Sequence, residues 1–380
     1  MFIRPLPALI GLAILFANQS TQASPTFSVT LLNPSIAGSA YTSKAFGVNE
    51  NGDVVGSTTY GGGDFLTVWS RDGTVLKYPG SSSAGQPSTH MDAFGINDSR
   101  QVIADNSPSV LIGIDGTVTT VTGSGTKPSN PRAVNNAGLV VGSTAKVING
   151  RNSQTAFAWS AEDGFVDLGS QVGIDPAYSQ ALAVNKAGDA AGSARFADGY
   201  HAVLWTNGSA LDLGRLSNTN TSQAWGMNDI GAVVGDSGDT EATDKAFIWT
   251  GDLGMRELGS LPDYGQGTGT TAYDINNSGQ VVGYSGKYFN HVGFFWDEVD
   301  GMRRLDELID QTSTYSGLKI IDAAAINDAG QIAATAIWQG RRTAVLLSPN
   351  AIPEPGSLGL IFGGLGSLLF LRGTLGRRNG

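Results

Sequence analysis

The amino-acid sequence predicts an all-β fold, a seven-bladed β-propeller closed by an N-terminal strand, from three observations. The first is a motif that occurs seven times, clearest at Ala272–Gly283: small, any two, apolar, Asn, two residues, Gly, any, two apolar, Gly. The second is spacing, because successive motif asparagines lie 38 to 51 residues apart, the length of a four-stranded blade. The third is that no stretch combines a period of 3.6 with helix caps. The repeat-turn asparagines are Asn49, Asn97, Asn135, Asn185, Asn228, Asn276 and Asn327.

The sixth repeat shows how one blade is expected to fold. Thr271–Asn276 is the predicted first strand, and a tight turn with Gly279 leads to the second, Gln280–Tyr284. The third strand is His291–Trp296, and the fourth is Met302–Leu305. Each repeat therefore predicts one antiparallel four-stranded sheet.

A tryptophan recurs in the third strand of five repeats, at Trp69, Trp159, Trp205, Trp249 and Trp296. Such a ring could be a platform for a sugar. Apolar residues on both faces of a strand, however, suit a sheet that packs between two neighbouring sheets. We therefore interpret these tryptophans as core between blades.

Ring closure is predicted from the two ends of the repeat region, residues 24–350. The last repeat ends at Ala344–Leu347, which is a third strand, whereas Phe27–Leu32 resembles a fourth. Pairing the two would complete the seventh blade and protect its edge. The second repeat is degenerate, because Asn97–Arg100 lacks the turn glycine and Ser109–Ile114 lacks the tryptophan.

Residues 1–23 have the features of a secretory signal peptide. Arg4 precedes the apolar run Pro7–Ala17, and small residues lead to an expected cleavage between Ala23 and Ser24. The sequence contains no cysteine, so an exported form would rely on closure and packing rather than on disulfides.

Residues 351–380 differ in composition from the repeats. Pro353, Glu354 and Pro355 are followed by the apolar run Gly356–Leu371, and then by Arg372, Arg377 and Arg378. As a helix the run would span roughly 24 Å, short for a hydrocarbon core of about 30 Å. We expect a short transmembrane sorting helix with its arginines on the cytoplasmic side; a plain C-terminal anchor is the alternative.

Two families are similar to these segments. The Pro-Glu-Pro tripeptide, short apolar span and terminal arginines resemble the PEP-CTERM sorting tail, which an exosortase is believed to recognise and cut in Gram-negative bacteria that make exopolysaccharide. The repeats over Tyr41–Leu347 resemble the HAF family of extracellular repeats, with Ile-Asn-x-x-Gly-x-Val-Val-Gly and a later His-Ala-Phe-x-Trp. Only His201–Trp205 keeps that histidine here. The resemblance implies export to the cell surface or extracellular space, with signal peptidase and exosortase as partners, and it assigns no reaction.

The charge of the repeat region limits its partners. Without Arg4, Glu354 and the three C-terminal arginines, the chain holds 19 basic and 32 acidic residues, a net charge of −13. Such a body repels phosphate backbones, so we expect no nucleic acid, and contact with a membrane only through the C-terminal tail.

Motifs for catalysis are sparse. The three histidines lie in different repeats, and no Gly-x-Ser-x-Gly or His-Glu-x-x-His occurs. Asp236–Asp239 and Asp239–Asp244 suggest a calcium loop but lack the EF-hand spacing, so we favour a solvated acidic loop. We expect no catalytic residue, cofactor or metal ligand, with calcium as the one alternative.

A ligand is expected on the face of the propeller that carries the long loops, which connect second to third strands and one blade to the next. Tyrosines gather in these loops, and a tyrosine ring suits a sugar. The alternative is that each ring holds only its own loop. The candidate ligand face comprises Tyr60, Tyr178, Tyr200, Tyr264, Tyr288 and Tyr315.

These observations predict an exported cell-surface or extracellular-matrix protein that is non-enzymatic and binds polysaccharide or protein. The alternative is a secreted glycan-cleaving enzyme, a hydrolase or a lyase, on a propeller scaffold. A converging pair of carboxylates at the mouth of the central channel would distinguish the two.

Overall fold

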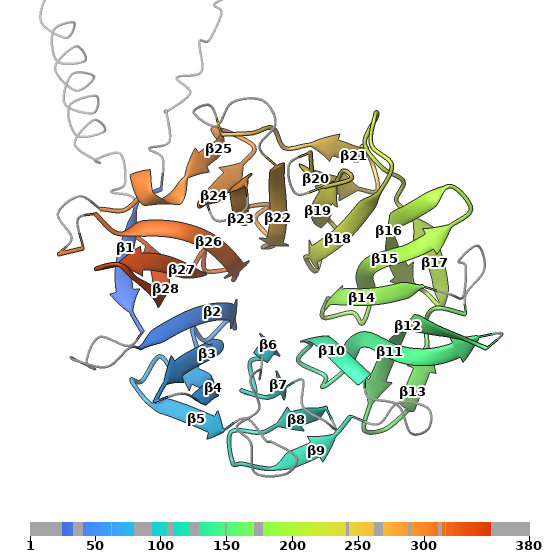
Figure 1. Ribbon diagram of the computed structural model, residues 1–380, viewed down its shortest axis with the longest axis horizontal. Coiled ribbons are helices and arrows are strands. Elements are labelled where there is room, and N and C mark those ends of the chain that lie inside the picture. Colours follow the sequence, from blue (N-terminus) through green and yellow to red (C-terminus); the bar gives the residue numbers. More distant parts are fainter. Residues whose placement is uncertain are drawn as a thin grey trace, which may run out of the picture. The chain divides into compact units, whose positions relative to one another are not determined.

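The computed structural model describes residues 25–32, 41–61, 63–79, 93–104, 109–121, 129–170 without 149, 178–261 without 241–242, 269–287, 290–310, and 314–350 without 316. Thr26–Asn350 form one compact unit. In that unit seven four-stranded antiparallel sheets surround a common centre (Figure 1), and the first strand of each repeat lies nearest the centre. The predicted all-β, seven-bladed propeller is confirmed.

Blades 1 to 6 each consist of four strands consecutive in sequence, with the innermost first. Blade 1 contains β2 (Thr42–Val48), β3 (Val54–Tyr60), β4 (Gly63–Trp69) and β5 (Val75–Pro79). Blade 2 contains β6 (Ala93–Ile96), β7 (Val102–Ala104), β8 (Val110–Ile112) and β9 (Val118–Thr120). Blade 3 contains β10 (Ser129–Val134), β11 (Val140–Ile148), β12 (Arg151–Ser160) and β13 (Gly164–Asp167).

The next three blades follow the same plan. Blade 4 contains β14 (Ser179–Val184), β15 (Ala190–Phe196), β16 (Gly199–Thr206) and β17 (Ser209–Asp212). Blade 5 contains β18 (Ser222–Met227), β19 (Val233–Ser237), β20 (Lys245–Thr250) and β21 (Gly254–Glu257). Blade 6 contains β22 (Gly269–Ile275), β23 (Val281–Lys287), β24 (Asn290–Asp297) and β25 (Gly301–Arg304).

Blade 7 is completed from the other end of the chain. It contains β26 (Lys319–Ile326), β27 (Ile332–Trp338), β28 (Arg341–Pro349) and, as its outer strand, β1 (Phe27–Leu31). The register pairs Phe27 with Pro349 and Leu31 with Val345, as the closure prediction requires. The Phe27 ring is buried and lies edge-on to Phe295 at 5.7 Å. Closure therefore ties the first described strand into the core between blades 6 and 7.

The motif asparagine closes the turn after each innermost strand. In blade 1 the Asn49 carbonyl accepts from Gly52 N–H at 3.0 Å, and its side-chain oxygen accepts from Asp53 N–H at 2.8 Å. Gly52 has φ +80°, a conformation that glycine adopts without strain. In blade 2, where the glycine is missing, Arg100 takes the position with φ +59°. The asparagine thus specifies the turn even in the degenerate repeat.

The core lies between blades, as predicted from the tryptophan pattern. Trp69, Trp159, Trp205 and Trp296 are buried, and Trp249 is partly buried against the cluster around Phe247. Trp205 Nε1 donates to the Leu168 carbonyl of the preceding blade at 3.1 Å. These rings therefore pack blade on blade and do not form a sugar platform.

Helical structure among the described residues is one 3₁₀ turn, η1 (Leu305–Glu307). No helix in the described part of the chain is long and apolar enough to span a membrane. The predicted signal peptide and sorting helix lie outside the described residues.

Candidate ligand site in the central channel

Each innermost strand contains a β-bulge three residues before its motif asparagine. In β2, for example, the pairing register shifts between Ala45 and Gly47, so Phe46 has no partner on β3. A bulge breaks the alternation of a strand and re-aims one side chain. The seven bulged residues are Phe46, Phe94, Arg132, Leu182, Trp225, Tyr273 and Ala324.

Small residues beside each bulge let the innermost strands approach one another. The position after the bulge is Gly or Ala in six blades. At Gly226 an added Cβ would lie 2.5 Å from the Tyr273 carbonyl oxygen of the next blade, closer than any side chain tolerates. The repeat therefore fixes the residues around the bulge by packing and leaves the bulged residue free to vary.

All seven bulged residues line one cavity of about 450 Å³, here called the central cavity. Its other lining residues lie near the long-loop ends of their strands, including Lys44 on β2, His291 on β24 and Arg342 on β28. The central cavity thus opens toward the face that carries the long loops. The remaining lining residues are Ala45, Ile321, Asp322 and Thr335.

Aromatic rings hold the walls of this cavity in place. Trp225 meets Tyr273 edge-on at 5.8 Å, and its indole N–H donates to the Asp236 carboxylate. Tyr273 packs at 5.4 Å from Tyr284, which stacks on His291 at 4.3 Å. Blades 5 and 6 therefore present a continuous, braced aromatic wall.

Two carboxyl groups at this end of the channel have raised pKa values. Burial raises the pKa of Asp322 to about 6, although hydrogen bonds from Thr335 and the nearby charges of Lys44 and Arg342 oppose the shift. Burial raises the pKa of Asp236 to about 7; the Trp225 N–H lowers it and Asp244 raises it further. Perturbed carboxyl groups in a cavity are typical of functional sites.

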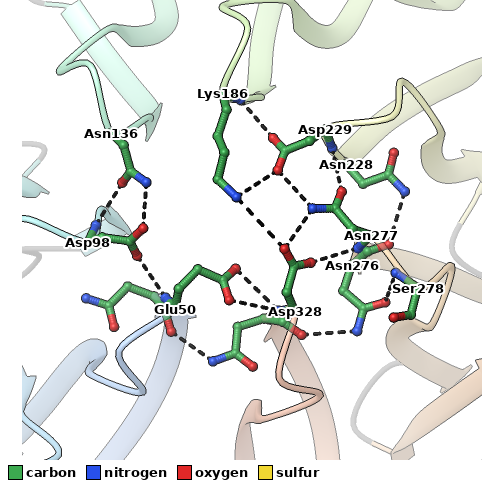
Figure 2. Close-up of polar contacts among 12 residues, drawn as sticks. Glu50, Asp98, Asn136, Lys186, Asn228, Asp229, Asn276, Asn277, Ser278 and Asp328 are labelled. Carbon is green, nitrogen blue, oxygen red and sulfur yellow. Dashed lines mark hydrogen bonds and ion pairs between the residues drawn. The ribbon is translucent and has the colours of Figure 1, made fainter.

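The opposite end of the channel is built from the asparagine turns (Figure 2). The Asn49 side-chain amide donates to the Asn97 carbonyl at 3.0 Å, and the same contact recurs from Asn97 to Asn135 and from Asn135 to Asn185. It recurs again along Asn228, Asn276 and Asn327, and returns to the Asn49 carbonyl. These six described contacts link the blades at six of their seven junctions, and at the junction of blades 4 and 5 Lys186 N–H donates to Asp229.

A second tier comes from the residue after each asparagine. Asp98 Oδ1 accepts from Glu50 N–H at 2.9 Å, and Asp229 Oδ1 accepts likewise from Lys186 N–H. The Lys186 ammonium lies 2.9 Å from Asp229 and 3.9 Å from Asp328 (Figure 2). These groups surround a cavity of about 160 Å³. Because they bond to one another, we interpret this end of the channel as structural.

The tyrosines of the predicted ligand face do not share one site. Tyr178 and Tyr200 meet edge-on at 4.9 Å in a third cavity of about 360 Å³, the side cavity, between blades 4 and 5. Tyr60 stacks on Phe65 at 4.9 Å, and Tyr315 packs edge-on against Trp338 at 5.5 Å. Tyr264 and Tyr288 lie outside the described residues. The structure therefore brings two of the six together in a cavity.

The other predicted sites are placed as follows. The cleavage position at Ala23 and Ser24, and the sorting residues Pro353, Glu354, Pro355, Arg372, Arg377 and Arg378, lie outside the described residues. Asp236, Asp239 and Asp244 all line the side cavity. Within the described ranges no three His, Asp or Glu side chains are grouped so as to hold a metal ion.

Sequence reasoning missed the bulged residues, although the sequence contains their signal. The motif position three residues before the asparagine holds aromatic, basic and aliphatic residues in different repeats, while the neighbouring positions, apart from Asp274, stay small or apolar. A position that varies inside a conserved repeat is free of the packing constraint.

This chain is similar to known proteins mainly in its fold. Residues 174–352, slightly under half of the chain, match the family described as "Protein of unknown function (DUF3466)". No curated protein matches the chain. A structure from a study of two prolyl endopeptidases is similar at a TM-score of 0.51 and 10% identity, covering 86% of this chain and 50% of that one.

Two further structures are similar at lower scores. Pyrococcus horikoshii acylaminoacyl peptidase has a TM-score of 0.44 and 13% identity, covering 85% of this chain and 54% of that one. Trypanosoma rangeli sialidase has a TM-score of 0.40 and 12% identity, covering 91% and 62%. The chain spans about half the length of the two peptidases, and at these identities the likeness concerns the fold alone.

Proposed function

We propose that this protein is an exported surface or matrix protein that binds a polysaccharide, without chemical conversion, in the central cavity and on the surrounding long-loop face. The observation that carries the proposal is the convergence of all seven bulged residues on one cavity. At each bulge one residue has no pairing partner on the neighbouring strand, and its side chain differs from blade to blade. Packing alone gives no reason for that variation, whereas recognition of an irregular ligand does.

The size and chemistry of the cavity support a sugar ligand. A volume of about 450 Å³ falls within the range typical of small-molecule sites, roughly 300–1,000 Å³. Phe46, Phe94, Trp225 and Tyr273 supply rings, and the cavity also contains charged groups that can fix orientation. Flat rings with a few placed polar groups suit the alternating apolar and hydroxylated faces of a sugar. A protein ligand stays the alternative for the wider loop face.

Binding is tested by retention of the purified protein on the exopolysaccharide of the source organism. We expect the double variant Phe46→Ala with Trp225→Ala to bind about tenfold more weakly or worse. Phe165→Ala, which removes a ring from the outer strand β13, is the matched control and should bind like the parent. A parent protein that shows no retention would refute the proposal.

A glycan-cleaving enzyme remains the alternative function. Among the described residues that line the central cavity, Asp322 is the single carboxylate, whereas glycoside hydrolysis generally uses two. The observation that favours chemistry is the raised pKa of Asp322 beside Tyr273 and His291. Shortening of the polysaccharide by the parent, lost in Asp322→Asn, would establish the enzyme in place of the binding protein.

Sorting through the C-terminal tail is part of the proposal. Pro353–Pro355, the short apolar run and the terminal arginines support processing by an exosortase after removal of the signal peptide. Deleting residues 372–380 should leave an unprocessed precursor, visible as a larger intact mass in protein recovered from cells. Normal processing and placement of the shortened chain would contradict this part.

A further inference from the structure

We infer that the central cavity selects an acidic saccharide, with the carboxylate of a uronic acid unit held by Lys44, Arg132 and Arg342 and its ring resting on the aromatic wall. This inference rests on the proposed function and adds the chemical class of the ligand. Three observations support it: the sign of the charge in the cavity, the placement of the three cations, and the braced rings.

The charge of the cavity is opposite to that of the body. The repeat region has a net charge of −13, yet the described lining of the cavity has three permanent cations against one carboxylate. The pKa of that carboxylate, Asp322, is raised to about 6, so part of its negative charge is lost in mildly acidic medium. An acidic protein that gathers cations in one concave site is suited to an anion there.

Two of the cations, Lys44 and Arg342, lie on the strands that join blades 7 and 1. Ser43 Oγ on β2 accepts from Ala344 N–H on β28 at 2.9 Å; Lys44 follows Ser43, and Arg342 lies two residues before Ala344. Both charges act on Asp322. Both side chains line the central cavity, where their cationic ends can receive an incoming carboxylate.

The third cation comes from the bulge of blade 3. The Arg132 guanidinium lies 4.3 Å from the centre of the Phe94 ring, a cation–π contact that restrains its orientation. A restrained guanidinium suits a planar carboxylate, to which it can donate two parallel hydrogen bonds. Blades 1, 3 and 7 thus supply charge, while blades 5 and 6 supply the braced rings of Trp225 and Tyr273.

The acidic surface around the cavity also limits how closely negative charges can be spaced along the ligand. Beyond the cavity the acidic surface repels a polyanion over a distance of about 8 Å at physiological salt. A chain with a carboxylate on every sugar, or a nucleic acid, would meet that repulsion along its length. A polysaccharide with spaced uronic acid units would place one charge in the cavity and neutral sugars on the rim.

The test compares the native exopolysaccharide of the source organism with the same polymer after chemical reduction of its carboxyl groups to alcohols. We expect retention on the native polymer, at least about tenfold weaker binding to the reduced one, and weakening with added salt. Equal binding to both polymers would overturn this inference and leave the proposed function intact. Binding to neither would overturn the proposed function itself.

Variants of the cavity cations test whether these side chains are responsible for the preference for the native polymer. Lys44→Gln with Arg342→Gln should lose about tenfold or more in binding to the native polymer and little in binding to the reduced one. Arg341→Gln is the matched control, because Arg341 precedes Arg342 on β28 and does not line the cavity. If Arg341→Gln and the double variant weaken binding equally, the cations of the cavity do not select the ligand.

Discussion

The two ends of the central channel are made by the same seven strands, yet they follow opposite rules. At the turn end every blade contributes the same residue, an asparagine, and in six of the seven blades its side chain donates to the backbone of the next blade. At the loop end, three residues earlier on the same strand, the blades contribute Phe46, Phe94, Arg132, Leu182, Trp225, Tyr273 and Ala324.

The difference separates what the fold requires from what a ligand would require. In such a chain of hydrogen bonds most members both donate to one blade and accept from another, so the turn end tolerates little variation. The bulged residues bond to no neighbour in a fixed pattern, so each can be chosen separately. The repeat therefore builds a rigid frame and leaves one position per blade free to vary, which is the position that our proposal assigns to recognition.

The largest expected effect comes from breaking the ring on which both ends depend. Deleting residues 24–33 removes β1, including the buried Phe27 and its hydrogen bonds to Leu308 and Asp310. We expect aggregation or a large fall in the melting temperature, because the deletion exposes a strand edge and opens the core. Phe27→Ala alone should cost about 3–5 kcal/mol of unfolding free energy. An unchanged melting curve for the deletion would refute the closure.

A smaller effect should follow from pH. Burial raises the pKa of Asp236 and Asp274 to about 7 and of Asp322 to about 6, above the ordinary value of 3.8. Folding thus favours the protonated forms of these carboxyl groups. Their contribution to the free energy of unfolding is fully present below about pH 4 and is lost as the pH rises through 6 to 7. We expect a lower melting temperature at pH 8 than at pH 5.5.

The variant Asp236→Asn isolates one of these groups. Asparagine keeps an acceptor for the Trp225 indole N–H and does not ionise. The loss of melting temperature between pH 5.5 and 8 should be smaller in this variant than in the parent. Equal losses would show that general charge repulsion, and not this buried carboxyl, sets the pH dependence.

Much of the frame was predictable from the sequence, and the site was not. The spacing of the asparagines predicted the number of blades. The missing fourth strand of the last repeat predicted that the N-terminal strand closes the ring, as the pairing of Phe27–Leu31 shows. Both predictions follow from sequence patterns within single repeats. The variable position marks the bulged residues in the sequence, but the bulge itself is a register shift that depends on how the strands of a blade, such as β2 and β3, pair. The raised pKa of Asp322 was equally hidden, because it depends on burial among residues distant in sequence.

The smallest expected effect concerns the tyrosines of the side cavity. Tyr178→Ala with Tyr200→Ala should weaken retention on the polysaccharide by about threefold, since these rings line the side cavity and not the central one. Tyr315→Ala is the contrast, because its ring packs on Trp338 and its loss should lower the melting temperature instead. If the double variant lowers stability and leaves retention unchanged, these tyrosines only hold their own loops.

The most direct test compares two alanine variants on β2 and its turn, Phe46→Ala and Asn49→Ala, by polysaccharide retention and by melting temperature. Asn49 donates to Asn97 and accepts from Asp53, so its variant should lose about 1–3 kcal/mol of unfolding free energy. Phe46 only lines the cavity, so its variant should keep the melting temperature of the parent and bind several-fold more weakly. If Phe46→Ala lowers stability and leaves binding unchanged, the division of the channel into a structural end and a recognition end is wrong.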